Sequence, residues 1–380
     1  MNGFDRFLTS LKRKTRSWNF FAITKIKRFQ YWDKLLSFLF SYPSRCFCRK
    51  APLEIEKFKN PNHNLKYFSD NFGRFSTSKS LIGVVSLESS DVIVTQHLLK
   101  IIFETLKSSR ILELCTIEIL SKVLAYRNLQ ENMKIWVPIA TATDHVEYVE
   151  FVVDTIFDLW HQHTAFGLRP VSVSHISPIL LFRGTDFSFN RQGGRASILS
   201  DLDPDGPGRR LYLCCRSSIR HWLLQMSHLG EKTRVLGHSL GGVLATYAAV
   251  YEHDLISKNP LQASYSFNAP GITEDLLADW NDLAEEDRPS FYSFVTRGDI
   301  VSKFGKMFGE TYETFTSRPL SPMLSHEQLI FSQPLSYMCK IDVDKENDSS
   351  SRKYYSTIQK QTTSWAYRFG LRFLFPQSTL

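Results

Sequence analysis

Hydrophobic residues recur with a helical period in the second quarter of the chain. Between residues 90 and 130, leucine and isoleucine are spaced by three and four positions, which predicts two helices. A third helix is predicted at 144–160, where Asp144 is suited to be the N-cap. Residues 81–160 are therefore expected to form a helical region.

From residue 177 the pattern changes to short apolar runs that alternate with amphipathic or helix-favouring ones. The apolar runs predict four strands, at 177–185, 234–237, 263–268 and 291–296. The segments around them predict helices at 209–226, 241–254 and 273–284. Strands that alternate with helices pair in parallel through crossover helices. The predicted fold class is α/β, with a mostly parallel sheet, flanking helices, a helical N-terminal region and basic terminal extensions.

Charge separates the two ends of the chain from its middle. Residues 1–50 carry twelve basic and two acidic side chains, and residues 351–380 carry five basic side chains and no acidic one. The net charge of the whole chain is +8, so the residues between these ends carry −7. Three units are therefore predicted: a basic, aromatic extension with linker at 1–80, an α/β domain at 81–345 and a basic tail at 346–380.

The basic ends have two interpretations. Twelve aromatic residues lie among the basic residues of 1–50, a combination that favours adsorption to an anionic membrane through both ends, 1–50 and 351–380. The alternative for 1–50 is a partly disordered tail or a helix packed on the body. No nucleic-acid-binding module is recognisable, so nucleic acid is not expected as a partner.

The bulk composition limits the compartment and the cofactors. Hydrophobic residues make up 43% of the chain, enough for a sizeable core. The six cysteines have no regular spacing, which favours reduced thiols and an intracellular protein, with peripheral membrane association as an option. No apolar run is long enough for a transmembrane helix, and no secretory signal is evident. No metal site and no cofactor site is predicted.

One serine stands where a strand turns sharply into a helix. In the stretch GHSLGG, Ser239 is flanked two residues on either side by Gly237 and Gly241. This Gly-x-Ser-x-Gly spacing is typical of a nucleophile elbow, in which the glycines let strand and helix approach each other without a Cβ clash. The turn exposes the hydroxyl and places the helix N-terminus beside it. Ser239 is therefore the candidate nucleophile.

A serine nucleophile needs a histidine base and a carboxylate, which follow it in this order: serine, acid, histidine. Asp299 follows the last predicted strand in RGDIV and is the candidate acid. Only one histidine, His326, lies after Asp299. If a triad in this order exists, His326 is the base.

The oxyanion of an acyl-transfer reaction needs two hydrogen-bond donors. The N–H of Leu240, the residue after the nucleophile, is the first candidate. The second is the N–H of Thr185, which follows a predicted strand and a glycine in FRGT.

Five stretches now stand in a characteristic order along the chain. They are FRGT (182–185), SDLDPDGPG (200–208), GHSLGG (237–242), FNAPG (267–271) and RGDIV (297–301). In this order and spacing the chain resembles the class 3, fungal-type lipases. The resemblance covers about 175–330 and implies an α/β-hydrolase fold and hydrolysis of lipid or acylglycerol esters. It implies Ser239, Asp299 and His326 as the triad, with Thr185 and Leu240 as oxyanion donors.

Two functions remain open from the sequence. The first is a lipase-like serine hydrolase that cleaves acylglycerol, phospholipid or lysophospholipid esters through an acyl-enzyme. The second is a catalytically lapsed hydrolase scaffold that binds membranes or proteins. The presence of every required residue type favours the enzyme.

Overall fold

The computed structural model describes residues 55–58, single positions between 92 and 106, and residues 109–357 with short gaps. The predicted membrane-binding segment 1–50 and residues 358–380 lie outside the described residues. The described part belongs to one compact unit, 51–380.

A ten-stranded mixed sheet is the centre of this unit, in the order β1-β10-β9-β8-β7-β6-β5-β4-β3-β2. The strands are β1 (Ile55–Phe58), β2 (Lys134–Ala142), β3 (His145–Trp160), β4 (His163–Pro170), β5 (Ile179–Phe182), β6 (Arg234–His238), β7 (Ser264–Phe267), β8 (Phe291–Thr296), β9 (Glu310–Thr316) and β10 (Ser336–Lys340). Strands β5 to β9 run parallel, of which β5 to β8 were predicted and β9 was not, and both flanks of the sheet are antiparallel. The α/β class is confirmed, but parallel pairing is confined to these five central strands.

The predicted helix at 144–160 is wrong, because this segment is strand β3. It pairs with β2 on one side and β4 on the other, both antiparallel. Its buried residues include Val149, Phe151 and Val153, which alternate with less buried neighbours. That period of two belongs to a strand whose one face packs on the core. The two hairpins pair the main chain of β3 on both of its sides, while β2 forms the edge of the sheet.

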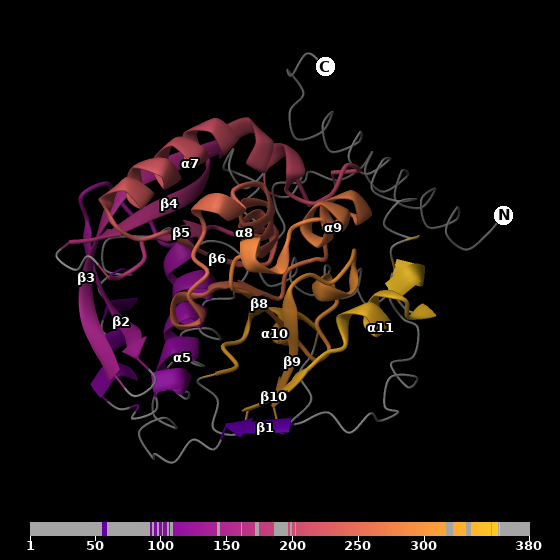
Figure 1. Ribbon diagram of the computed structural model, residues 1–380. Coiled ribbons are helices and arrows are strands. Elements are labelled where there is room, and N and C mark those ends of the chain that lie inside the picture. Colours follow the sequence, from indigo (N-terminus) through magenta and orange to yellow (C-terminus); the bar gives the residue numbers. More distant parts are fainter. Residues whose placement is uncertain are drawn as a thin grey trace, which may run out of the picture. The chain divides into compact units, whose positions relative to one another are not determined.

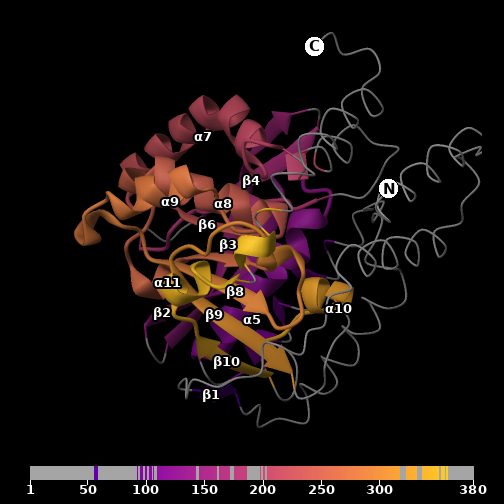
Figure 2. The ribbon, with the colours of Figure 1, turned by 90° about the vertical axis from the view of Figure 1, so that its right-hand side faces the viewer.

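Helices cover both faces of the sheet (Figures 1 and 2). The α-helices are α5 (Ser109–Lys122), α7 (Arg209–Leu229), α8 (Leu240–Tyr251), α9 (Glu274–Asn281), α10 (Pro322–Glu327) and α11 (Val343–Asn347). The 3₁₀ helices are η2 (Leu124–Tyr126), η3 (His253–Leu255), η4 (Pro260–Gln262), η5 (Glu285–Asp287) and η6 (Val301–Lys303). Helix α5 and the predicted helices of the central region, α7, α8 and α9, thus appear where the sequence places them.

The two faces of the sheet carry separate apolar cores. One core packs α5 against residues such as Leu236, Phe267 and Phe294 of the central strands. The other packs α7, α8 and α9 against the opposite side of the same strands, including Val235 and Phe291. Neighbouring residues Val235 and Leu236 of β6 point into different cores, as the pleat of a strand dictates. Strand β6 is therefore buried on both faces, directly below the candidate nucleophile.

A buried ion pair ties α5 to the start of β6. Arg234 is fully buried, and its Nη2 donates to Oε1 of Glu113 on α5. Its Nε donates to the carbonyl of Ala263, just before β7. The other Glu113 oxygen accepts from the N–H of Ala140 in β2, at 3.3 Å. Helix α5 is thus fixed to three strands by charge as well as by apolar packing.

Parts of both predicted extensions contribute to the body. Strand β1 lies in the segment assigned to the linker and pairs antiparallel with β10. Arg352 lies in the segment assigned to the basic tail and is 3% exposed. The boundaries of the predicted units stay a prediction. Among the described residues, no helix has the length and apolar character needed to cross a membrane.

Candidate active site

Ser239 stands on a sharp turn between β6 and α8. Its backbone has φ 57° and ψ −128°, a conformation that L-residues with a Cβ rarely adopt. Its N–H donates to the carbonyl of Phe267, and its carbonyl accepts from the N–H groups of Gly242 and Val243. These bonds hold the turn against β7 and against the first turn of α8. The cost of the backbone conformation is therefore borne by the surrounding structure.

Gly237 and Gly241 let strand and helix cross at this turn. A Cβ on Gly237 would come within 2.0 Å of the carbonyl oxygen of Gly241. A Cβ on Gly241 would come within 2.5 Å of the carbonyl oxygen of Phe182, at the end of β5. Both contacts are with main-chain atoms, which cannot move aside as a flexible side chain could. The predicted reason for glycine at these two positions agrees with this geometry.

His326 brings the three predicted polar side chains together. Its Nε2 lies 2.9 Å from the Ser239 hydroxyl oxygen, and its Nδ1 lies 3.1 Å from Oδ1 of Asp299. The three residues are buried, with exposed fractions of 6%, 5% and 1% for Ser239, His326 and Asp299. If Nδ1 carries the ring proton and donates it to Asp299, Nε2 is free to accept the proton of Ser239. The arrangement can therefore transfer a proton from the serine hydroxyl to the imidazole.

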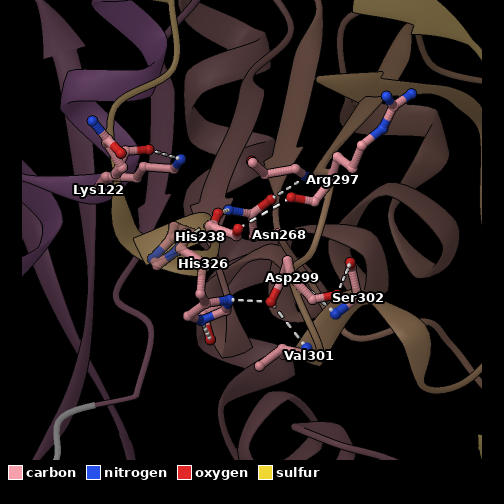
Figure 3. Close-up of polar contacts among 12 residues, drawn as sticks. Lys122, His238, Asn268, Arg297, Asp299, Val301, Ser302 and His326 are labelled. Atoms are coloured by element: carbon pink, nitrogen blue, oxygen red, sulfur yellow. Dashed lines mark hydrogen bonds and ion pairs between the residues drawn. The ribbon is translucent and has the colours of Figure 1, made fainter. Parts of the chain in front are cut away.

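The carboxylate of Asp299 is oriented by the main chain that follows it. Its Oδ1 accepts from the N–H of Val301 at 3.0 Å, and its Oδ2 accepts from the N–H of Ser302 at 3.2 Å (Figure 3). With the His326 bond, three donors point at this carboxylate. Such a carboxylate is held in one orientation, facing the imidazole.

The pKa values of two neighbouring histidines are shifted in opposite directions. Burial lowers the pKa of His326, but the charge of Asp299 and the hydrogen bond to it outweigh burial, so the net pKa is raised above 6.5. Burial and the nearby positive charge of His326 lower the pKa of His238 well below 6.5. His238 is therefore neutral, and His326 is the histidine whose protonation is favoured.

His238 and Asn268 hold the main chain of His326. Nε2 of His238 donates to the His326 carbonyl at 2.8 Å, and Nδ2 of Asn268 donates to it at 2.6 Å. Nδ1 of His238 then accepts from the hydroxyl of Tyr126, 3.1 Å away. Asn268 also donates to the carbonyl of Ser325, and its Oδ1 accepts from the N–H of Thr296 at the end of β8. One asparagine thus links the histidine segment to the strand that leads to the acid.

Helix α5 holds the segment on the other side of His326. Oε1 and Oε2 of Glu118 accept from the N–H groups of Ile330 and Phe331 at 2.8 and 2.9 Å. Nζ of Lys122 donates to Glu118 and to the carbonyl of Gln328 (Figure 3). Glu118 and Lys122 are both buried, so these charge-assisted bonds form away from water. Residues 328–331 are therefore fixed to the core that contains α5.

Thr185 lies at the edge of the same site. A Cβ on the preceding Gly184 would come within 2.5 Å of the His238 carbonyl oxygen, so this segment packs directly beside the elbow. The Thr185 hydroxyl donates to Oδ2 of Asp201 at 2.7 Å. Burial raises the pKa of Asp201 to about 7, although the Thr185 bond and the charge of His326 both lower it. Leu240 is the first residue of α8, and its N–H has no partner among the described residues.

No cluster of histidine, cysteine or carboxylate side chains in the described part of the chain has the arrangement of a metal site.

Several residues around the site were not predicted as functional. Asn268 stands in FNAPG and His238 in GHSLGG. Both stretches belong to the motif series, but the sequence did not indicate which contacts these two residues make. Tyr126, Glu118 and Lys122 carried no sequence signal, because helix periodicity explains them equally well as part of an amphipathic helix end.

The comparisons with known proteins agree with the sequence motifs. Residues 209–308 match the class 3 lipase family, a range that includes Ser239 and Asp299. The solved structure of a Rhizomucor miehei lipase–propeptide complex is 17% identical, covering 55% of this chain and 67% of that chain, with a TM-score of 0.38. A mutant form of MDLA from Penicillium cyclopium is 14% identical, covering 70% of this chain and 92% of that chain, with a TM-score of 0.39. A triacylglycerol lipase from Penicillium expansum is 14% identical, covering 53% of this chain and 77% of that chain, with a TM-score of 0.33. A sequence search of curated proteins found no match.

Proposed function

We propose that the chain is a serine hydrolase of lipid acyl esters, because residues 209–308 match the class 3 lipase family. This match supports the coarser statement, a lipase-like carboxylic ester hydrolase. The finer statement is that Ser239, His326 and Asp299 form its catalytic triad. The observation that carries it is the position of His326 between the other two, at 2.9 Å from Ser239 and 3.1 Å from Asp299.

In the proposed mechanism, Nε2 of His326 takes the proton of Ser239 as the oxygen attacks the ester carbonyl. Asp299 stabilises the imidazolium that forms. The carbonyl oxygen becomes an oxyanion, which accepts hydrogen bonds from the N–H groups of Leu240 and Thr185. His326 then protonates the departing alcohol oxygen. A water molecule, deprotonated by His326, attacks the acyl-enzyme and releases the carboxylic acid.

The substrates we propose are acylglycerols, phospholipids or lysophospholipids. The fold and the family favour a lipid acyl chain, and the head group stays open.

Covalent labelling tests the proposal against the lapsed-scaffold alternative. We expect a fluorophosphonate probe to label the purified chain and not the Ser239→Ala variant, because the probe phosphonylates only an activated serine. Ser217→Ala, which removes an exposed hydroxyl on α7, is the matched control and should label normally. A folded wild-type chain that is never labelled would favour a scaffold without chemistry.

We further propose that the basic ends hold the chain on anionic membranes. Deleting residues 1–50 should weaken binding to phosphatidylserine-containing vesicles in a flotation assay and leave hydrolysis of a short soluble ester unchanged. Equal flotation of the truncated chain would count against this role. Arg352 is not part of the proposed surface, because it is buried in the body.

A further inference from the structure

The side chain of Arg352 donates hydrogen bonds to main-chain carbonyls of a single loop. Its Nη1 donates to the carbonyls of Gly305 at 3.0 Å and Phe304 at 3.4 Å, and its Nη2 donates to the carbonyl of Ser302 at 3.2 Å. These residues belong to the acid loop, defined here as residues 299–307, which begins at Asp299. A planar guanidinium with several fixed donors is suited to hold several carbonyls at once.

The ion pair of Arg352 is a long one. Oε1 of Glu346 lies 3.9 Å from Nε, and Nε itself makes no hydrogen bond. The residue is 3% exposed. A buried cation is costly unless polar groups surround it, so the carbonyls of the acid loop add to the stabilisation that Glu346 gives.

Ser302 connects this guanidinium to the triad. Its N–H donates to Oδ2 of Asp299, while its carbonyl accepts from Arg352. Figure 3 shows Ser302 and Val301 on the side of Asp299 away from His326. A displacement of the Ser302 main chain would therefore move a donor that orients the carboxylate. Arg352 is two hydrogen bonds from Asp299 and three from the imidazole.

A second contact from the same C-terminal segment holds the end of the acid loop. Oδ1 of Asn347 accepts from the N–H of Met307 at 2.7 Å, and its Nδ2 donates to the Met307 carbonyl at 3.2 Å. Asn347 ends α11 and is buried. The segment from Asn347 to Arg352 thus contacts both the middle and the end of the acid loop, far outside the 209–308 family match.

We propose that Arg352 is a positioning residue of the active site, which holds the acid loop so that Asp299 faces His326. The inference rests on the proposed triad and deepens it. If Arg352 has this role, the reaction depends on the C-terminal segment, which the sequence alone suggests is only a basic tail.

Kinetics of a double-mutant cycle test the proposal. Arg352→Met should lower kcat for a short p-nitrophenyl ester about 10- to 100-fold with little change in KM, and Arg352→Lys should lose less. In an Asp299→Asn background the same Arg352→Met change should cost less than about threefold, because the residue acts through Asp299. Lys353→Met, which alters an exposed neighbour, is the control. Equal losses in both backgrounds would mean a general structural role and would overturn the proposal.

A readout that needs no turnover separates this proposal from the proposed function. The His326 Nδ1 proton shared with Asp299 should give a downfield proton NMR resonance that is absent in Asp299→Asn. We expect this resonance to shift or broaden in Arg352→Met and Arg352→Lys and to stay unchanged in Lys353→Met. An unchanged resonance in both Arg352 variants would overturn the positioning role. If the Arg352 variants show the expected shifts but the wild-type chain is neither labelled nor hydrolyses esters, the proposed function alone would be overturned.

Discussion

Replacing Asp299 by asparagine is expected to lower kcat for a short p-nitrophenyl ester by a factor of about 10⁴. The asparagine fits the same space but carries no charge to stabilise the imidazolium. Its amide group can also present a donor to Nδ1 of His326, which favours the wrong tautomer. Asp282→Asn, at an exposed position after α9, is the matched control and should retain full activity. A loss below tenfold would exclude Asp299 as the acid of the triad.

The same variant should change the pH dependence of kcat/KM. His326 must be neutral to accept the Ser239 proton, so activity falls as the pH drops through its pKa. Asp299 raises the pKa of His326, which places the acid limb of the wild-type profile above pH 6.5. Without that charge the pKa falls, and the acid limb should move to lower pH. Of the remaining neighbours, Lys122 lowers this pKa, and Glu327 raises it when ionised. Burial raises the pKa of Glu327 to about 8, so Glu327 carries its charge only in the alkaline part of the profile.

The second large effect is expected on stability, at the ion pair between Glu113 and Arg234. Glu113→Leu leaves the fully buried guanidinium of Arg234 without its carboxylate. Removing one partner of such a pair typically costs about 3–5 kcal/mol of unfolding free energy. Urea unfolding followed by circular dichroism measures this loss. The variant should remain folded only if the wild-type chain has stability to spare.

A double variant and a surface control make this test specific. Adding Arg234→Met to Glu113→Leu removes the stranded charge and should recover part of the loss. Asp287→Ala breaks the exposed pair with Lys258 and should cost less than about 1 kcal/mol. If Glu113→Leu is as mild as Asp287→Ala, the buried pair contributes little to the fold.

The central part of the fold could be predicted from the sequence because its elements are locally unambiguous. Strands β5 to β8 are short apolar runs, and the helices between them have clear amphipathic or helix-favouring composition. The failure at β3 has an identifiable cause. Residues 149–153 alternate between buried and less buried positions, but the apolar residues Val149, Val152, Val153 and Ile156 are also spaced by three and four positions, as on one face of a helix. The β-branched and aromatic content favoured a strand.

The candidate site divides in the same way. Ser239 was predictable from a local motif with a mechanical reason for its glycines, and His326 from its being the only histidine after Asp299. The contacts that hold these residues were not predictable. Glu118 and Lys122 act on residues more than 200 positions away, and their sequence context resembles any amphipathic helix end.

The distances along the chain between these partners affect how the protein reaches its native state. The bond from Glu118 to Ile330 closes a loop of 212 residues, and Lys122 to Gln328 closes one of 206. Contacts of such sequence separation form late in folding, after the entropy of loop closure has been overcome. A nascent chain that has emerged only as far as residue 308 would contain Ser239 and Asp299, yet it would lack both the histidine and the strands that border it. Under the proposed function, esterase activity should therefore appear only after the segment that carries His326 and the strands around it has been made and has folded.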